Sequence, residues 1–155
     1  MRDRSQCKTH YCAAVDADER ARACAEVMFA EDAASRALGI TIAGVAPGRA
    51  TARMAVTGAM VNGHGIAHGG YVFLLADTAF AFACNTYDQR TVAAGGDIVF
   101  VAPAAAGDRL VATAEERVRA GRSGIYDITV RREADGAVIA ELRGRSRTIA
   151  GTLLG

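Results

Sequence analysis

The chain has 155 residues and nearly balanced charge, with 18 Lys and Arg against 17 Asp and Glu. This length suits a single domain with a real core, and a net charge of +1 gives no electrostatic basis for binding nucleic acid or an anionic membrane. Residues 1–12 contain no apolar stretch of signal-peptide length. The apolar run at 71–84 would span about 21 Å as a helix, short of the roughly 30 Å hydrocarbon layer. We therefore expect a soluble, cytoplasmic protein with reduced thiols.

The beginning of the chain differs from the rest. Residues 1–19 are polar and unpatterned, so we expect a flexible N-terminal extension there and one domain over 20–155. Cys7, His10 and Cys12 cluster within the extension. Structural zinc sites usually use four ligands, so we expect no metal.

The patterning of the remaining segments predicts helices and strands in a clear order. Residues 20–38 combine helix formers with a broad apolar face, which predicts an amphipathic helix capped by Gly39. Alternation predicts strands at 40–46, 50–56, 91–101, 109–118, 124–131 and 137–149. Between the second and third strands lies a helix over 70–85 that is apolar on every side and must be covered all round.

Short links between the last four strands favour an antiparallel sheet made of consecutive hairpins. A sheet that covers a fully apolar helix must curl around it. The predicted fold class is therefore α+β, with a curved antiparallel sheet wrapped around one long central helix and an extra N-terminal helix.

Asp77 is the only charged residue in the apolar run 71–84. Burying an unpaired carboxylate is costly, so Asp77 is either ion-paired with an arginine or has a chemical role. The glycine-rich segment 62–70 precedes it and ends in Gly69 and Gly70. Free N–H groups at a helix start and the helix dipole stabilise developing negative charge, which makes Gly69 a candidate oxyanion hole.

The spacing between these two groups has a consequence for assembly. Asp77 follows Gly69 by about 12 Å along a helix, whereas a carbonyl held by the Gly69 N–H must lie within about 3 Å of it. If both groups act on one substrate, the acid must come from a second subunit. Two helices packed antiparallel about a twofold axis would bring each Asp77 to the partner's Gly69, which predicts a dimer with two composite sites.

The segment 62–85 closely resembles a known enzyme family. It reads Asn-Gly-His at 62–64, His-Gly-Gly at 68–70 and Leu-Ala-Asp-Thr-Ala-Phe-Ala at 75–81, and it is similar to the PaaI-type phenylacetate-pathway thioesterases of the hotdog-fold acyl-CoA thioesterase superfamily. The resemblance covers about residues 25–152. It implies metal-free hydrolysis of a thioester, phenylacetyl-CoA or hydroxyphenylacetyl-CoA, to the free acid and CoA. It also implies a homodimer, commonly a dimer of dimers, with no cofactor beyond the CoA of the substrate.

The same resemblance implies roles for individual residues. Asp77 matches the catalytic acid, acting as nucleophile or general base, and Gly69 matches the residue whose N–H polarises the carbonyl. Asn62 and His68 match polar neighbours that orient the carbonyl or water, although His68 could simply cap the helix and Asn62 could only stabilise a turn. Thr78 matches a hydroxyl that positions water from the other subunit. The candidate substrate-binding residues are Gly70, Phe73, Arg122 and Ser123.

The chain departs from the pattern of this family at two positions. Where many relatives carry Asn, Ser or Thr, this chain has Asp97, and where many carry Arg before a proline it has Ala102. These changes add negative charge near the path of acyl-CoA and remove a phosphate contact.

One alternative function is a non-catalytic acyl-CoA-binding or sensing protein of the same fold. The other is a hotdog dehydratase, which usually pairs its acid with a histidine from elsewhere, whereas no histidine follows His68 here.

Overall fold

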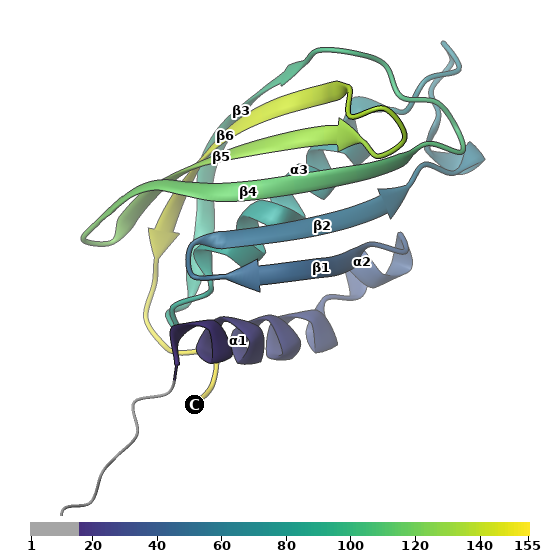
Figure 1. Ribbon diagram of the computed structural model, residues 1–155. Helices are drawn as coiled ribbons and strands as arrows, with labels where there is room; N and C mark the ends of the chain where they lie inside the picture. The colour runs from purple at the N-terminus through teal and green to yellow at the C-terminus, as the bar shows by residue number, and fades with distance from the viewer. Residues whose placement is uncertain (1–15) are drawn as a thin grey trace, which may run out of the picture.

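The computed structural model describes residues 16–155, which form an antiparallel sheet curved around one helix (Figure 1). The helices are α1 (Ala17–Glu31), α2 (Ala33–Ala37) and α3 (Gly69–Cys84), with a short 3-10 turn at Gly58–Met60. The strands are β1 (Thr41–Ala46), β2 (Arg49–Ala55), β3 (Thr91–Phe100), β4 (Arg109–Ala120), β5 (Ser123–Arg132) and β6 (Val138–Thr148). The predicted α+β fold with a central helix and an N-terminal helix is confirmed.

The strand order is β1-β2-β4-β5-β6-β3, and every neighbouring pair is antiparallel. The expectation that β3 and β4 form a hairpin is wrong, because β3 pairs with β6 at the far edge of the sheet. The link between them crosses the end of the sheet and is tied to distant strands. Val101 N–H donates to Ile139 O at 2.8 Å, and Gly107 N–H donates to Val56 O at 2.8 Å. As a result β3 is an edge strand.

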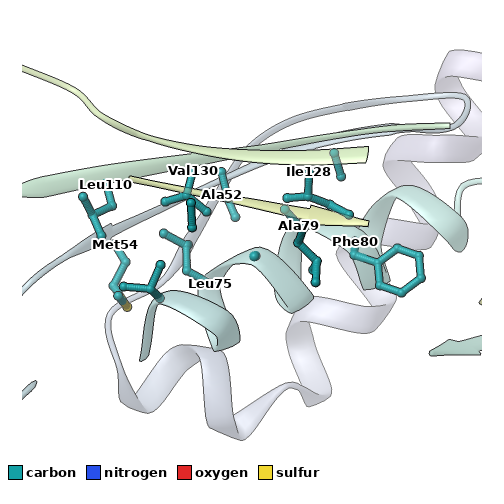
Figure 2. Packing of buried hydrophobic residues seen from close by; sticks show 14 of the residues in the cluster. Ala52, Met54, Leu75, Ala79, Phe80, Leu110, Ile128 and Val130 are labelled. Atoms are coloured by element: carbon teal, nitrogen blue, oxygen red, sulfur yellow. The ribbon is translucent and has the colours of Figure 1, made fainter. Parts of the chain in front are cut away.

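The core lies between the concave face of the sheet and α3. Figure 2 shows Leu75 and Ala79 of α3 pointing towards the side chains of the sheet. The sheet contributes alternate residues from several strands, among them Ala52, Met54, Leu110, Ile128 and Val130, all of them buried. The apolar residues whose alternation predicted the strands therefore lie on the buried face of the sheet.

One side of α3 is left uncovered by the described chain, contrary to the expectation that the sheet would surround it. The exposed and half-exposed positions recur at helical spacing and form a stripe: Gly70, Phe73, Leu74, Asp77 and Ala81. Phe73 is 37% exposed within this stripe. The edge strand β3 also exposes apolar side chains, including Val92, Val99 and Phe100. Contiguous exposed apolar surface of this kind is typical of an interaction face.

The predicted helix over 20–38 is in fact two helices. Asp32 interrupts it, because its Oδ1 accepts a hydrogen bond from the Ser35 N–H at 2.9 Å and so caps the start of α2. Gly39 follows α2 with φ +67°, in the left-handed conformation expected of a helix-terminating glycine. Helix α1 begins at Ala17, so residues 17–19 belong to a helix and not to an extension.

Candidate active site

The first turn of α3 leaves the Gly69 N–H without a partner in the described chain. His68 is the N-cap, and its Nδ1 accepts a hydrogen bond from the Gly70 N–H at 2.9 Å. Tyr71 N–H donates to the His68 carbonyl, also at 2.9 Å. The Gly69 N–H, in contrast, has no hydrogen-bond acceptor among residues 16–155. Because it lies at the positive end of the helix dipole, it can bind an oxygen that carries developing negative charge.

Phe100 lies against Gly69, a contact that sequence reasoning missed. A Cβ at Gly69 would lie 2.8 Å from the end of the Phe100 ring, so the close approach of the ring, and not an unusual φ, favours glycine here. A cavity of about 510 Å³ adjoins Gly69 and is lined also by Ala102 and Pro103. The only signal in the sequence was an aromatic residue at the end of a strand, which does not distinguish a site from a core.

Asn62 lies in the wall of the same cavity and holds the glycine-rich loop together. Its Oδ1 accepts hydrogen bonds from the His64 N–H at 2.9 Å and the Ile66 N–H at 3.4 Å. This arrangement stabilises the turn. The Nδ2 donor makes no hydrogen bond within the described chain, so the side chain has a donor left for a ligand.

Asp77 is half-buried and unpaired. Its carboxylate makes no hydrogen bond or ion pair with any residue from 16 to 155. The alternative of a structural acid paired with an arginine therefore fails within one chain. Burial raises the pKa of Asp77 above its usual value. An unpaired carboxylate with a raised pKa on an exposed apolar stripe is typical of a functional group.

Two other polar side chains of α3, Thr78 and Cys84, are buried and are not available for catalysis within one chain. The Thr78 hydroxyl is buried, donates to the Leu74 carbonyl at 2.9 Å and lies 3.2 Å from the Ser35 hydroxyl. It therefore connects α3 to α2 and, within one chain, has its hydrogen bonds already made. Burial raises the pKa of Cys84 to about 12, which keeps it a thiol and excludes it as a thiolate nucleophile at neutral pH.

Arg122 and Ser123 lie at the opposite end of the sheet from Gly69. Ser123 pairs with Arg147 of β6, which pairs with Val92 at the beginning of β3, whereas Phe100 at the end of β3 contacts Gly69. Val92 and Phe100 are about 26 Å apart along an extended strand. Arg122 Nε donates to the Thr148 carbonyl at 3.0 Å, which fixes its stem. The predicted substrate-binding residues therefore do not converge on one site within a single chain.

The extra negative charge of Asp97 is compensated. Arg145 Nη1 donates to Asp97 Oδ2 at 2.8 Å on the exposed outer side of the sheet. This ion pair reduces the repulsion that an isolated carboxylate would exert on the phosphates of acyl-CoA.

No group of three or more His, Cys, Asp or Glu side chains in the described part of the chain could hold a metal ion. Cys7, His10 and Cys12 lie outside that part. The helices between residues 16 and 155 are all too short or too polar to cross a bilayer.

The cap at His68 can be tested by its effect on stability. We expect His68→Ala to lower the free energy of unfolding by about 0.5–2 kcal/mol, because the Gly70 N–H loses its acceptor. His68→Asn should recover most of this loss, since asparagine is a favourable N-cap residue. Chemical denaturation of the three proteins measures both effects. Equal stability of His68→Ala and the wild type would show that the cap contributes nothing.

Comparison with protein families identifies a matching model, described as the thioesterase superfamily, over residues 64–139. This range includes all of α3, with Asp77, and the strands β3, β4 and β5. Among characterised proteins, the chain is similar to the acyl-coenzyme A thioesterase PaaI of Escherichia coli strain K12. The two are 44% identical over 131 residues, which span 84% of this chain and 93% of that protein.

Solved structures show the same relationship. The E. coli PaaI protein from the phenylacetic acid degradation operon matches with a TM-score of 0.86 and 42% identity, over 88% of this chain and 99% of that one. The TT0310 protein of Thermus thermophilus matches with a TM-score of 0.73 and 34% identity, over 77% and 99% of the two chains.

Proposed function

Because the chain belongs to the PaaI-type acyl-CoA thioesterases of the hotdog fold, we propose that it hydrolyses phenylacetyl-CoA or hydroxyphenylacetyl-CoA to the free acid and CoA. The observation that carries the mechanism is the unpaired, half-buried carboxylate of Asp77 on the same helix as the unpartnered Gly69 N–H. The reaction uses no cofactor beyond the CoA of the substrate.

In the proposed reaction the thioester carbonyl oxygen accepts a hydrogen bond from the Gly69 N–H, which stabilises the oxyanion of the tetrahedral intermediate. Asp77 acts as general base and takes a proton from the water that attacks the carbonyl carbon, or attacks that carbon itself as nucleophile. The carbon–sulfur bond then breaks, and the CoA thiolate leaves and is protonated. In the nucleophilic route this step leaves the acyl group on Asp77 as an anhydride, and water then hydrolyses the anhydride to release the acid and restore the carboxylate. A pKa raised by burial makes Asp77 a stronger base than an exposed carboxylate.

The site is proposed to form between two subunits. Gly69 and Asp77 are about 12 Å apart along α3, and Phe73 lies at the midpoint between them in the sequence. A twofold axis through two antiparallel α3 helices at Phe73 would place each Gly69 opposite the partner's Asp77. The 37% exposure of Phe73 supports this axis, because an apolar ring there gains by burial against its symmetry mate.

The edge strand β3 supports the same dimer. It borders the uncovered side of the molecule, has no strand paired to its outer side within the described chain and exposes Val92, Val99 and Phe100. Unpaired backbone groups on an apolar edge favour pairing with another chain. We propose a homodimer built on β3 and α3 that further assembles as a dimer of dimers.

This dimer also accounts for the separation of the substrate-binding residues. If β3 pairs antiparallel with its copy, the beginning of one β3 lies beside the end of the other. Arg122 and Ser123 of one subunit then lie at the same end of the dimer as the partner's Gly69. The subunit that supplies Asp77 to this site would therefore also supply the contacts to the CoA phosphates.

Release of free thiol from a panel of thioesters tests the proposed function. We expect turnover of phenylacetyl-CoA or hydroxyphenylacetyl-CoA at higher kcat/KM than of benzoyl-CoA or fatty acyl-CoA. Saturable binding of these thioesters without thiol release would overturn hydrolysis and would support an acyl-CoA-binding protein. Turnover confined to fatty acyl-CoA would contradict the proposed substrate but not the enzyme class.

A further inference from the structure

One wall of the cavity beside Gly69 is formed by a segment without regular secondary structure. Residues 101–108 link β3 to β4 and pass the turn between β5 and β6 (Figure 1), and residues 101–104 line the cavity. The segment follows directly on Phe100, whose ring lies against Gly69. Because it forms no strand or helix of its own, other contacts must satisfy its backbone groups and hold its shape.

Arg132, the last residue of β5, holds this segment near both of its ends. Its Nη2 donates to the Pro103 carbonyl at 2.9 Å, and its buried Nε lies 3.3 Å from Asp108 Oδ2. Its Nη1 donates to Asp135 Oδ2 at 3.2 Å in the turn that follows β5. A planar guanidinium can hold three such contacts in fixed directions, whereas a lysine ammonium on a flexible stem cannot.

The contacts of Arg132 fix Ala104 from both sides. Pro103, which precedes Ala104, accepts the hydrogen bond from Arg132. Ala105, which follows it, donates its N–H to Asp108 Oδ2 at 2.8 Å, the same oxygen that pairs with Arg132. Ala104 itself is 3% exposed. The position of its carbonyl therefore depends on the pair formed by Arg132 and Asp108.

This carbonyl is bonded directly to the residues that lead into α3. The Ala67 N–H donates to the Ala104 carbonyl at 2.8 Å, and the next N–H, that of His68, donates to the Met60 carbonyl at 2.8 Å. Gly69 follows immediately. The direction of its free N–H therefore depends on these two anchors, one of which belongs to the segment that Arg132 holds.

The geometry points to Arg132 as a positioning residue for the Gly69 N–H, with Asp108 as its partner. Neither side chain lines the cavity, so neither touches the substrate. Precise placement matters for an oxyanion donor, because a misplacement of about 1 Å can lower a rate about 10²-fold. The inference rests on the proposed role of Gly69 in thioester hydrolysis.

A neighbouring set of ion pairs provides a matched control. Glu133, the residue after Arg132, lies 2.9 Å from Arg109 Nε and 3.3 Å from Arg53 Nε. Neither arginine belongs to the segment 101–108, and none of these three residues lines the cavity. Glu133→Gln therefore weakens ion pairs at the same end of the sheet without releasing the segment.

Arg132→Met removes the guanidinium and keeps the apolar stem of the side chain. We expect this variant to lower kcat and kcat/KM for phenylacetyl-CoA equally, by about tenfold or more, because the Gly69 N–H acts on the transition state. Glu133→Gln should change neither constant by more than about twofold. An unchanged kcat in Arg132→Met, or an equal fall in both variants, would overturn the positioning role.

Asp108→Asn tests the other side of the pair. It keeps an acceptor for the Ala105 N–H and weakens only the ion pair with Arg132. We expect kcat to fall about threefold or more. If Arg132→Met does not fold, this variant carries the test, and a wild-type kcat in Asp108→Asn would overturn the inference.

Combination with Gly69→Pro separates positioning from a general loss of structure. Once the Gly69 N–H is absent its position no longer matters, so adding Arg132→Met to Gly69→Pro should lower kcat by less than about twofold. A further fall as large as in the wild-type background would show that Arg132 acts independently of the donor, and it would overturn the positioning role.

A carbonyl probe separates failure of this inference from failure of the proposed function. The probe is the ketone analogue of phenylacetyl-CoA, in which a methylene group replaces the thioester sulfur and prevents hydrolysis. A hydrogen bond from the Gly69 N–H lowers the stretching frequency of the bound carbonyl, which infrared difference spectroscopy measures.

Arg132→Met should reduce this frequency shift, and Glu133→Gln should leave it unchanged. That result with a wild type that releases no thiol would support the positioning role and overturn hydrolysis. Thiol release by the wild type, with the full shift retained in Arg132→Met, would overturn the positioning role alone.

Discussion

Asp77→Asn is expected to lower kcat for thioester hydrolysis by about 10²–10⁴-fold, the usual contribution of a general base. Asparagine has nearly the same shape as aspartate but cannot accept the proton of the attacking water or form an anhydride. No described residue depends on the Asp77 carboxylate for a hydrogen bond or ion pair. The variant should therefore fold normally and still bind substrate. Circular dichroism would show the first, and calorimetry with S-(2-phenylethyl)-CoA, a thioether that cannot be hydrolysed, would show the second. Turnover near the wild-type rate would contradict the mechanism.

The pH dependence of stability gives a matching result for the same variant. Burial raises the pKa of Asp77 above its unfolded value, so the folded chain holds this proton more tightly than the unfolded chain. The stability contributed by the protonated carboxyl is present below the unfolded pKa, about 3.9, and is lost as pH rises through the higher folded pKa. Asp77→Asn should therefore melt at the same or a higher temperature than the wild type at pH 7. In the wild type, kcat/KM should fall on the acid side as Asp77 becomes protonated. The midpoint of this fall should lie above about pH 4, the ordinary value for an aspartate.

Gly69→Pro is expected to lower kcat by about 10²–10³-fold, the cost of removing one oxyanion donor. Gly69 is the first residue of α3, where proline fits the helix. His68 has φ −63° and ψ 130°, an extended conformation that a following proline tolerates. The substitution thus removes the N–H with little change in the backbone.

Gly69→Ala is the matched control for this prediction. It introduces a Cβ against the same Phe100 ring but keeps the N–H. Phe100 is 53% exposed and can move, so we expect a much smaller loss than for proline. Equal losses in the two variants would indicate that crowding by the ring, and not the missing donor, lowers the rate.

The fold was largely predictable because the patterns that reveal it are local. Alternation in the strands and the apolar helix 70–85 follow from which faces are buried. The break at Asp32 and the position of β3 were not predictable from those patterns. The break at Asp32 depends on a single capping hydrogen bond. The position of β3 depends on its long-range pairing with β6, which the periodicity of the sequence does not indicate.

The candidate site was predictable in its chemistry but not in its surroundings. One acid in an apolar run and glycines at a helix start are visible in the sequence, and the structure shows that acid to be unpaired within the described chain. The contact of Phe100 with Gly69 depends on segments far apart in the chain. The uncovered stripe on α3 could not be foreseen either, because an apolar helix looks the same whether its own sheet or a second subunit covers it.

Mixed dimers test most directly whether Asp77 acts on a thioester held by the other subunit. Asp77→Asn and Gly69→Pro subunits are combined in equal amounts by co-refolding, and thiol release is compared with that of each variant alone. A mixed dimer would contain one intact site, formed by Gly69 of the first variant and Asp77 of the second, so random pairing should restore about a quarter of wild-type activity. Activity no higher than the average of the two inactive variants, with mixed dimers present, would show that each site uses Gly69 and Asp77 of one chain.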